Sequence, residues 1–371
     1  MEQRTYTLLE DAQKAILERN PKSIFLVTGN GSFTNSGAER RLQYLLGRNV
    51  TRFNRFTTNP DIRDVERGIR LYNQVQPDYV VTVGGGSVID MAKLVRGLAN
   101  VSHPEEHLRE GKPIDTTNVP LIAIPTTSGS GSESTPYAVA YINGLKYSFH
   151  HNSNVPDEIV LDPTLTKSLP IKQTASSGFD ALSQAVEAYW SVNSTDESKQ
   201  HSKKAIGLVL NNLEKVVSCS DDLYSRKAMM IAANEAGKAI AIAKTTASHA
   251  ISYSMTSRFG IPHGHAVVLT LGDILEYNAG VSEKDCVDSR GVDYVKTTMS
   301  EIVDMFKAKT PEEAKERIKI LMRSVGLKTT LKEVGVSDVD TIIREVNLQR
   351  LKNNPRKLEE KDLRNILRLI S

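Results

Sequence analysis

Residues 244–265 contain the side chains best suited to bind a metal ion. Three of the chain's eight histidines, His249, His263 and His265, lie here among small and apolar residues. A turn with glycine and proline separates His249 from His263, which suits one ligand on a helix and one in the loop after it. A catalytic metal typically takes three protein ligands and keeps one position open. The segment therefore predicts two ligands, and His265 remains either a neighbour of the ligands or a surface residue.

An acidic residue on a predicted helix of small and apolar residues, 174–191, is the candidate third ligand. Asp180, Gln184 and Glu187 follow one another at spacings of four and three, which places them on one helix face. Taken alone, Asp180 is more simply a first-turn carboxylate that interacts favourably with the helix dipole. Two histidines that need a carboxylate partner make the ligand interpretation the stronger one.

Three apolar runs, residues 23–28, 79–83 and 120–124, are predicted to be strands, and each ends in a loop rich in glycine or hydroxyl groups. Glycines let a backbone approach a phosphate closely, and a following helix N-terminus offers N–H groups to an anion. A tight turn without a ligand is the alternative for the second loop, and a surface turn is the alternative for the third. Together they favour a dinucleotide site, although none has the G-x-G-x-x-G pattern of a standard Rossmann enzyme. The loop residues concerned are Gly29, Ser32, Gly84, Gly85, Gly86, Ser87, Thr126, Thr127 and Ser130.

The two halves of the chain differ in their periodicity. Strands alternating with helices predict an α/β domain with a parallel sheet over residues 1–165, and such sheets bind ligands at the carboxyl ends of their strands. Helical periodicity predicts an all-α domain over residues 166–371. The first domain should contain helices at about 37–46 and 88–100; the second at 174–191, 198–217, 222–242, 245–257, 266–278, 296–308, 311–325 and 360–370. The charged tail 351–370 is interpreted as an amphipathic helix.

Composition excludes several classes of protein. The 371 residues include 47 basic and 44 acidic side chains, and a net charge of +3 gives no nucleic-acid or membrane-surface signal. No apolar run approaches the length of a membrane span. Two cysteines in no metal or redox spacing indicate a reducing compartment without disulfides. The amphipathic N-terminus is unlike a targeting peptide, so a cytoplasmic location is expected.

Four motifs in the right order resemble the iron-containing (group III) alcohol dehydrogenases. They are VTVGGGSVIDMAK (81–93), PTTSGSGSE (125–133), GFDALSQAVEAYW (178–190) and SHAISY with GIPHG (248–264). The resemblance implies the dehydroquinate synthase-like fold, with a dinucleotide-binding α/β domain, an all-helical domain, and metal and nicotinamide in the cleft between them. It also implies a homodimer and reversible hydride transfer between a small alcohol or aldehyde and NAD(P).

The family's metal ligands fall on Asp180, His249 and His263. Many members have a further histidine ligand four residues after the aspartate, where this chain has Gln184, which would bind weakly through its amide oxygen or not at all. Two imidazoles and one carboxylate suit iron(II) or zinc about equally, so Fe(II) is expected with Zn as the alternative. Tyr253 stands where several relatives carry a histidine credited with proton transfer; it is either that proton donor or an aromatic packing residue.

The cofactor loops match as well. The pyrophosphate loop of the family falls on residues 84–87, with Asp90 and Lys93 in the helix behind it, and residues 126–130 match the loop that borders the nicotinamide. NAD-preferring relatives tend to carry an aspartate near Gly29, where it would repel a 2′-phosphate. Residues 29–32 offer no negative charge, so NADP(H) is favoured over NAD(H).

The substrate is a sharper expectation from the same resemblance. The second half is most similar to the branch that includes phosphonoacetaldehyde reductases, which make 2-hydroxyethylphosphonate. Lys244, with the hydroxyls of Thr245 and Thr246, is expected to hold the anionic group, a solvated lysine being the alternative. Further candidate cations are Lys146, His150, His151 and Arg258. The competing interpretations are a dehydrogenase of a neutral alcohol or polyol such as butanol, propanediol or glycerol, and a lyase like the dehydroquinate synthases.

Overall fold

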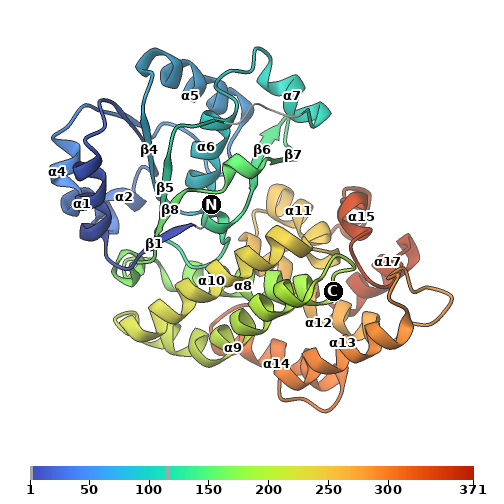
Figure 1. The fold of residues 1–371 in the computed structure, drawn as a ribbon. Helices are drawn as coiled ribbons and strands as arrows, with labels where there is room; N and C mark the ends of the chain where they lie inside the picture. The colour runs from blue at the N-terminus through green and yellow to red at the C-terminus, as the bar shows by residue number, and fades with distance from the viewer. Residues whose placement is uncertain (1–2, 113–116) are drawn as a thin grey trace. The chain divides into compact units, whose positions relative to one another are not determined.

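The computed structural model describes residues 3–112 and 117–371 and divides into two compact units, with the boundary between Leu169 and Pro170 (Figure 1). The first unit contains the sheet and the second is helical. The sequence placed this boundary a few residues earlier, at 165.

A six-stranded parallel sheet forms the first unit, in the order β1-β8-β5-β4-β2-β3. The predicted runs are the central strands β2, β4 and β5, and their complete burial explains their continuous apolar sequence. The strands β1, β3 and β8 are too short to show a pattern and were missed. The strands are β1 (Arg4–Tyr6), β2 (Ile24–Thr28), β3 (Val50–Phe53), β4 (Tyr79–Gly84), β5 (Leu121–Pro125) and β8 (Glu158–Val160).

Helices cover both faces of this sheet (Figure 1). Because side chains alternate along a strand, Phe25 and Val27 of β2 pack with α5 (Ile62–Val75) and α6 (Gly86–Gly97). Ile24 and Leu26 pack on the opposite face with α1 (Leu9–Arg19). The helix predicted at 37–46 is instead two short helices, α3 (Ala38–Arg41) and α4 (Gln43–Leu46), and the short helix α2 (Ser32–Asn35) precedes them. The unit also contains α7 (Pro104–Glu110), the antiparallel hairpin β6 (Tyr137–Ile142) and β7 (Leu145–His150), and the 3-10 turns η1 (Ser132–Ser134), η2 (Asn152–Asn154) and η3 (Pro163–Thr166).

The helices predicted in the second half are all present, with ends shifted by a few residues. They are α8 (Ile171–Trp190), α9 (Asp196–Ser218), α10 (Leu223–Ala243), α11 (Ala247–Phe259), α12 (His263–Ala279), α13 (Val292–Met305), α14 (Pro311–Ser324) and α17 (Glu360–Leu369). Two short helices were not predicted, α15 (Val339–Arg344) and α16 (Leu348–Leu351). The tail 351–370 is not one helix, because its helical part begins only at Glu360, after Pro355. In the described residues no helix is long and apolar enough to cross a membrane.

Two packing features of the second unit position its side chains. Helix α8 contacts α9, α10 and α12, so its residues are buried on several sides. His263 is the first residue of α12, which corrects the expectation that it lies in the loop before that helix.

Candidate functional site

The carboxyl ends of β2, β4 and β5 carry the three predicted cofactor loops on neighbouring strands. From β2 the chain runs outward to β3, and it then returns to place β4 on the other side of β2. The strand order therefore reverses between β2 and β4, and ligands of open parallel sheets bind at such a switch point. The loops after these strands, residues 29–32 and 84–87, lie at this point of the sheet.

The glycines of the second loop allow close approach to the third loop. A Cβ at Gly85 would lie 3.2 Å from Thr127 Cγ2, and one at Gly86 would lie 2.6 Å from Ser130 Oγ. The amide of Thr126 also donates to Gly84 O at 2.9 Å. The two loops are thus in contact. Gly86 and Ser87, at the end of the second loop, are already the first residues of helix α6, so N–H groups of the first helical turn are available there. Such an arrangement can hold a pyrophosphate.

Asp90 and Lys93 fasten the hydroxyl-rich loop to α6. The carboxylate of Asp90 accepts from Ser132 Oγ at 2.5 Å and from Val139 N at 3.1 Å. The ammonium of Lys93, fully buried, donates to Ser132 O, to Thr135 O at 2.8 Å and to Tyr137 O at 2.9 Å. Burial lowers the pKa of Lys93 to about 8, although the charge of Asp90 opposes this shift. Asp90 therefore holds the hydroxyl-rich loop in place, and its contact with a cofactor stays a prediction.

A cation that the sequence did not single out lies beside the first loop. Arg52 of β3 donates from Nε to Thr28 Oγ1 at 2.8 Å, directly before Gly29, and its guanidinium lies over the ring of Phe33. It also forms an ion pair with Glu39 at 3.2 Å. Ser32 begins the short helix α2, and its Oγ would lie 2.3 Å from a Cβ at Gly29.

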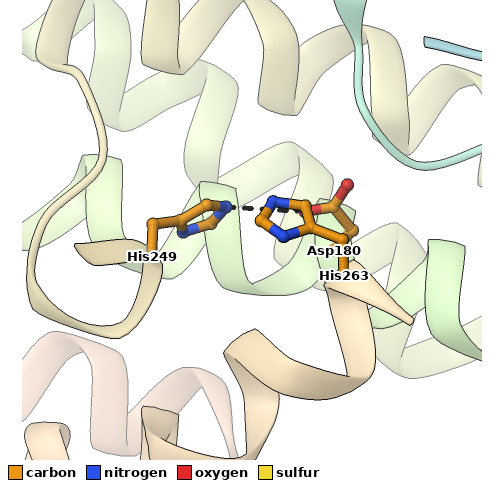
Figure 2. Close-up of side chains that lie close together, drawn as sticks. All are labelled: Asp180, His249 and His263. Atoms are coloured by element: carbon orange, nitrogen blue, oxygen red, sulfur yellow. Dashed lines mark ion pairs between the residues drawn. The ribbon is translucent and has the colours of Figure 1, made fainter. Parts of the chain in front are cut away.

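In the second unit, Asp180, His249 and His263 converge from α8, α11 and α12 (Figure 2). Asp180 Oδ1 lies 3.5 Å from His249 Nε2 and 3.9 Å from His263 Nε2. The rings of the two histidines meet edge to face, with centroids 5.4 Å apart. Two ligand atoms bound about 2.1 Å from a tetrahedral ion lie about 3.4 Å apart, so this spacing fits a metal ion.

A glycine allows the approach of α12 to α8. A Cβ at Gly264 would lie 1.9 Å from Ser176 O and 2.8 Å from Asp180 N, so no other residue fits without moving the helix. This contact brings the neighbouring His263 to Asp180. The glycine of the Pro-His-Gly motif is therefore required for the close packing that forms the candidate metal site.

Two buried atoms support a metal at this place. His249 Nε2 and Gln184 Oε1 are both buried, and neither atom has a hydrogen-bond partner among the described residues. Buried polar atoms normally have a partner, and an absent ion is one explanation of an exception. Burial alone would lower the pKa of His249, but the charges of Glu187 and Asp180 raise it to about 9. The two carboxylates therefore favour a positive charge at this ring, which a proton supplies as well as a metal ion. Gln184 lies one helical turn from Asp180, and its part in ligation stays a prediction.

Glu187 is the residue of this site whose role sequence reasoning missed. It is completely buried, and its Oε2 accepts from His249 Nδ1 on the side of the ring away from Asp180. Its Oε1 accepts from the backbone of Ser248 and from the hydroxyl of Thr246. The available signal was its position on the same helix face as Asp180.

The remaining histidine and the tyrosine of this segment are now placed. His265 is buried, its Nε2 lies 2.7 Å from Lys328 O, and its amide donates to Ser176 Oγ at 3.1 Å. It is not a surface residue, and it fastens α12 to α8. Tyr253 lies next to His263, with ring centroids 6.4 Å apart, so it borders the candidate metal site.

Both threonines that were expected to help hold an anionic group already have hydrogen-bond partners. Thr246 is buried with its hydroxyl bonded to Glu187 and Trp190, which excludes it as an anion ligand. Thr245 is buried as well, but Arg350 of α16 donates to its Oγ1 at 2.6 Å. Arg350 is half-buried, and no described carboxylate pairs with it or with the exposed Lys244. Two cations therefore flank Thr245.

The other candidate cations lie elsewhere in the chain. Arg258 forms an exposed ion pair with Glu345 at 2.7 Å. Lys146, His150 and His151 belong to the first unit, where Lys146 and His150 lie on β7.

Comparisons with known proteins show the family of the chain. The family model for iron-containing alcohol dehydrogenase matches residues 6–163, and the model for the C-terminal part of that family matches residues 174–370. Phosphonoacetaldehyde reductase of Streptomyces viridochromogenes is 34% identical over 319 residues, covering 84% of this chain and 80% of that protein. NADPH-dependent butanol dehydrogenase of Clostridium saccharobutylicum is 29% identical over 369 residues, covering 94% and 92%.

A solved structure shows the same fold. Sulfoacetaldehyde reductase of Bifidobacterium kashiwanohense, in complex with NAD+, has a TM-score of 0.87 at 26% identity, covering 99% of this chain and 96% of that chain. The predicted fold class and the family resemblance are confirmed, and the lyase alternative is set aside. Both halves of the chain belong to the iron-containing alcohol dehydrogenase family, which makes the protein an alcohol dehydrogenase or aldehyde reductase of the oxidoreductase class.

Proposed function

We propose that the protein reduces phosphonoacetaldehyde to 2-hydroxyethylphosphonate with NADP(H), using a metal ion held by Asp180, His249 and His263. In this reaction the aldehyde gains a hydride from the reduced nicotinamide and a proton from the site, and the oxidised cofactor is released. The reaction needs both candidate sites, one in each unit. The observation that carries the reaction class is the triad of ligand atoms within 4.8 Å of one another.

The residues of the triad have distinct tasks in this proposal. An ion bound there would act as a Lewis acid that polarises the carbonyl oxygen of the substrate. Asp180 lowers the net charge of the ion, and the histidines hold it at the ends of two helices. His263 is the most exposed of the three, with 34% of its side chain accessible to solvent. This leaves room for water or an aldehyde on that side. Tyr253 is the proposed proton donor because its ring borders His263.

Lys244 and Arg350 support an anionic substrate. Both lie at Thr245, four positions before His249, and neither is neutralised by a described carboxylate. Lys244 has φ 64° and ψ 168°, a backbone conformation that is rare outside glycine. Strain of this kind is concentrated at functional sites. Two positive charges suit a phosphonate, which can carry two negative charges, better than a sulfonate, which carries one.

The relatives support the same class of substrate. One is a reductase of phosphonoacetaldehyde and another of sulfoacetaldehyde, and both names describe a two-carbon aldehyde with a strong acid at the far carbon. The alternative is a neutral alcohol, favoured by the similarity to a butanol dehydrogenase that covers almost the whole chain.

The cofactor, metal and assembly complete the proposal. NADP(H) is favoured because Arg52 stands beside the uncharged loop 29–32, where an arginine can accommodate a 2′-phosphate. The complex of the sulfoacetaldehyde reductase with NAD+ supports the alternative. Iron(II) follows from the family description and zinc from the donor set. A homodimer and a cytoplasmic location belong to the same proposal, and light scattering tests the first.

Initial rates with a panel of aldehydes test the proposed substrate. Phosphonoacetaldehyde, sulfoacetaldehyde and butanal are each supplied with NADPH to the metal-loaded protein. We expect kcat/KM to fall in that order, with at least about a hundredfold between the first and the last, equivalent to about 2.7 kcal/mol. Equal values for butanal and phosphonoacetaldehyde would overturn the anionic substrate and favour the neutral alternative.

A further inference from the structure

Glu187 connects the metal site to the start of helix α11 through four hydrogen bonds. Its Oε1 accepts from Thr246 Oγ1 at 2.9 Å, Ser248 N at 2.8 Å and His249 N at 3.2 Å. Its Oε2 accepts from Nδ1 of the His249 ring. All four partners are donors, and the carboxylate has no exposed surface.

The three hydrogen bonds to Oε1 cap the N-terminus of α11 with a side chain from another helix, α8. Thr246, the N-cap of α11, makes no side-chain capping bond of its own. Its hydroxyl instead donates to Glu187, which accepts the backbone N–H groups of Ser248 and His249. Those N–H groups would otherwise be unpaired in the interior. A negative charge at this helix end is also favourable.

The fourth bond fixes the tautomer of a ligand. An ionised carboxylate only accepts hydrogen bonds, so Nδ1 of His249 must carry the proton. In the neutral ring the lone pair then lies on Nε2, the atom that faces Asp180 at 3.5 Å. A histidine binds a metal through an unprotonated nitrogen, and its other N–H is normally held by a carboxylate or carbonyl.

We propose that Glu187 is a positioning residue that presents His249 to the metal in the one tautomer able to bind it. The inference rests on the proposed metal centre and adds to it a residue outside the ligand set. Only a carboxylate satisfies both ends of this arrangement. The amide of a glutamine has one accepting and one donating end, and the backbone N–H groups at Oε1 require the accepting one.

For Glu187→Gln we therefore predict a change in which nitrogen of His249 carries the proton. With its oxygen kept at the backbone of α11, the amide NH2 faces Nδ1 of His249 and donates to it. Nδ1 must then lose its proton, Nε2 gains it, and the neutral ring no longer offers a lone pair to the ion. The cap of α11 is kept in this variant, whereas His249 loses its ability to bind the metal through Nε2.

The experiment compares Glu187→Gln with a matched variant, Glu235→Gln. Glu235 is a buried carboxylate of the same unit that lies 2.5 Å from His201 Nδ1 and pairs with Lys204, neither of which belongs to the triad. Zinc affinity is measured by competition with a chelator, and thermal unfolding of the metal-free proteins controls for folding. We expect Glu187→Gln to weaken Zn²⁺ binding about 10–100-fold and Glu235→Gln to leave it within about twofold. Wild-type zinc affinity in a folded Glu187→Gln would overturn the inference.

A second measurement does not depend on a variant. In the zinc-loaded wild type, ¹⁵N–¹H correlation spectra of the histidine rings should show His249 protonated at Nδ1 and metal-bound at Nε2. The reverse assignment would overturn the role of Glu187 even if Glu187→Gln failed to fold. If the wild type binds no zinc or iron, the metal centre itself fails, which separates that outcome from the failure of Glu187 alone.

Discussion

The ring of Tyr253 stacks beside that of His263, with centroids 6.4 Å apart and planes inclined by 25°. Tyr253 comes one helical turn after His249 on α11, so it shares the helix face of a candidate ligand. The phenol therefore borders the place where an alkoxide would form. Its position is compatible with proton donation, and a packing role predicts a different result on mutation.

Tyr253→Phe keeps the ring and removes only the hydroxyl. If the phenol supplies the proton, kcat for aldehyde reduction should fall about a hundredfold, because general acid catalysis contributes on that order or more. Tyr253→His should restore part of the rate, and the metal content of all three proteins should be equal. A kcat of Tyr253→Phe within twofold of the wild type would leave only the packing role.

Arg350 and Lys244 are predicted to set the preference for an anionic aldehyde. Loss of a charge-assisted hydrogen bond costs about 1.5–3 kcal/mol, so Arg350→Ala should lower kcat/KM for phosphonoacetaldehyde by about 10–100-fold. The value for butanal should change less than about threefold. Arg258→Ala removes an exposed cation of α11 and is the matched control. Equal losses of kcat/KM for both aldehydes would mean that Arg350 stabilises the fold and does not recognise the anionic group.

Lys244→Gly separates charge from backbone strain. Glycine adopts the observed φ of 64° without a Cβ penalty, so this variant should unfold at a higher temperature by an amount equivalent to about 1 kcal/mol. It should nevertheless lose the preference for phosphonoacetaldehyde. A more stable variant with an unchanged preference would show that the Lys244 side chain is solvated and does not bind the substrate.

Cofactor preference should depend on Gly29, which follows β2, and on Arg52 of the neighbouring strand β3, which donates to Thr28 at the end of β2. Arg52→Ala should raise KM for NADPH about tenfold and leave that for NADH unchanged. Gly29→Asp should shift preference towards NADH by repelling the 2′-phosphate. Because its Cβ would collide with Ser32 Oγ at 2.3 Å, it is made together with Ser32→Ala, and Ser32→Ala alone is the control. An unchanged ratio of the two cofactors in both variants would contradict the NADP(H) proposal.

Acid should destabilise the first unit partly through Asp162. This buried carboxylate accepts from Thr164 Oγ1 at 2.6 Å and from Arg41 at 2.6 Å. Burial would raise the pKa of Asp162, but these bonds outweigh it and hold the pKa below its usual value. The contribution to stability is therefore complete above the unfolded pKa of about 4 and is lost as the pH falls through the lower folded value.

Asp162→Asn tests this dependence. The variant should be less stable at pH 7 by about 2 kcal/mol, and its melting temperature should fall less than that of the wild type between pH 5 and about pH 3. Circular dichroism melts over this range measure the difference. Parallel curves for the two proteins would show that Asp162 does not contribute in this way.

Sequence alone indicated the elements whose signals are local. The strands β2, β4 and β5 are continuous apolar runs, and the ligand types of Asp180, His249 and His263 are visible in their motifs. Strands such as β3 are short and half-buried, so they show no alternation to recognise. The helix expected at 37–46 is divided at Leu42, whose φ of −93° and ψ of 16° are not helical, and Gly37, with φ 78°, separates it from the preceding α2.

Roles that depend on distant partners could not be predicted. Glu187 stands on the predicted helix face, but its partners come from residues 246–249, about sixty positions along the chain. Thr246 looked available as an anion ligand because nothing local shows that Trp190 and Glu187 use its hydroxyl. Arg350 reaches Thr245 from a four-residue helix that has no amphipathic signal.

The metal centre is tested most directly by metal analysis of the purified protein and of His263→Ala. His201→Ala, a histidine of the same unit paired with Glu235, is the matched control. We predict about one iron or zinc ion per chain in the wild type and in His201→Ala, and almost none in His263→Ala, which should keep NADPH binding but lose reductase activity. Retention of both metal and activity by His263→Ala would contradict the assignment of Asp180, His249 and His263 as the catalytic metal site.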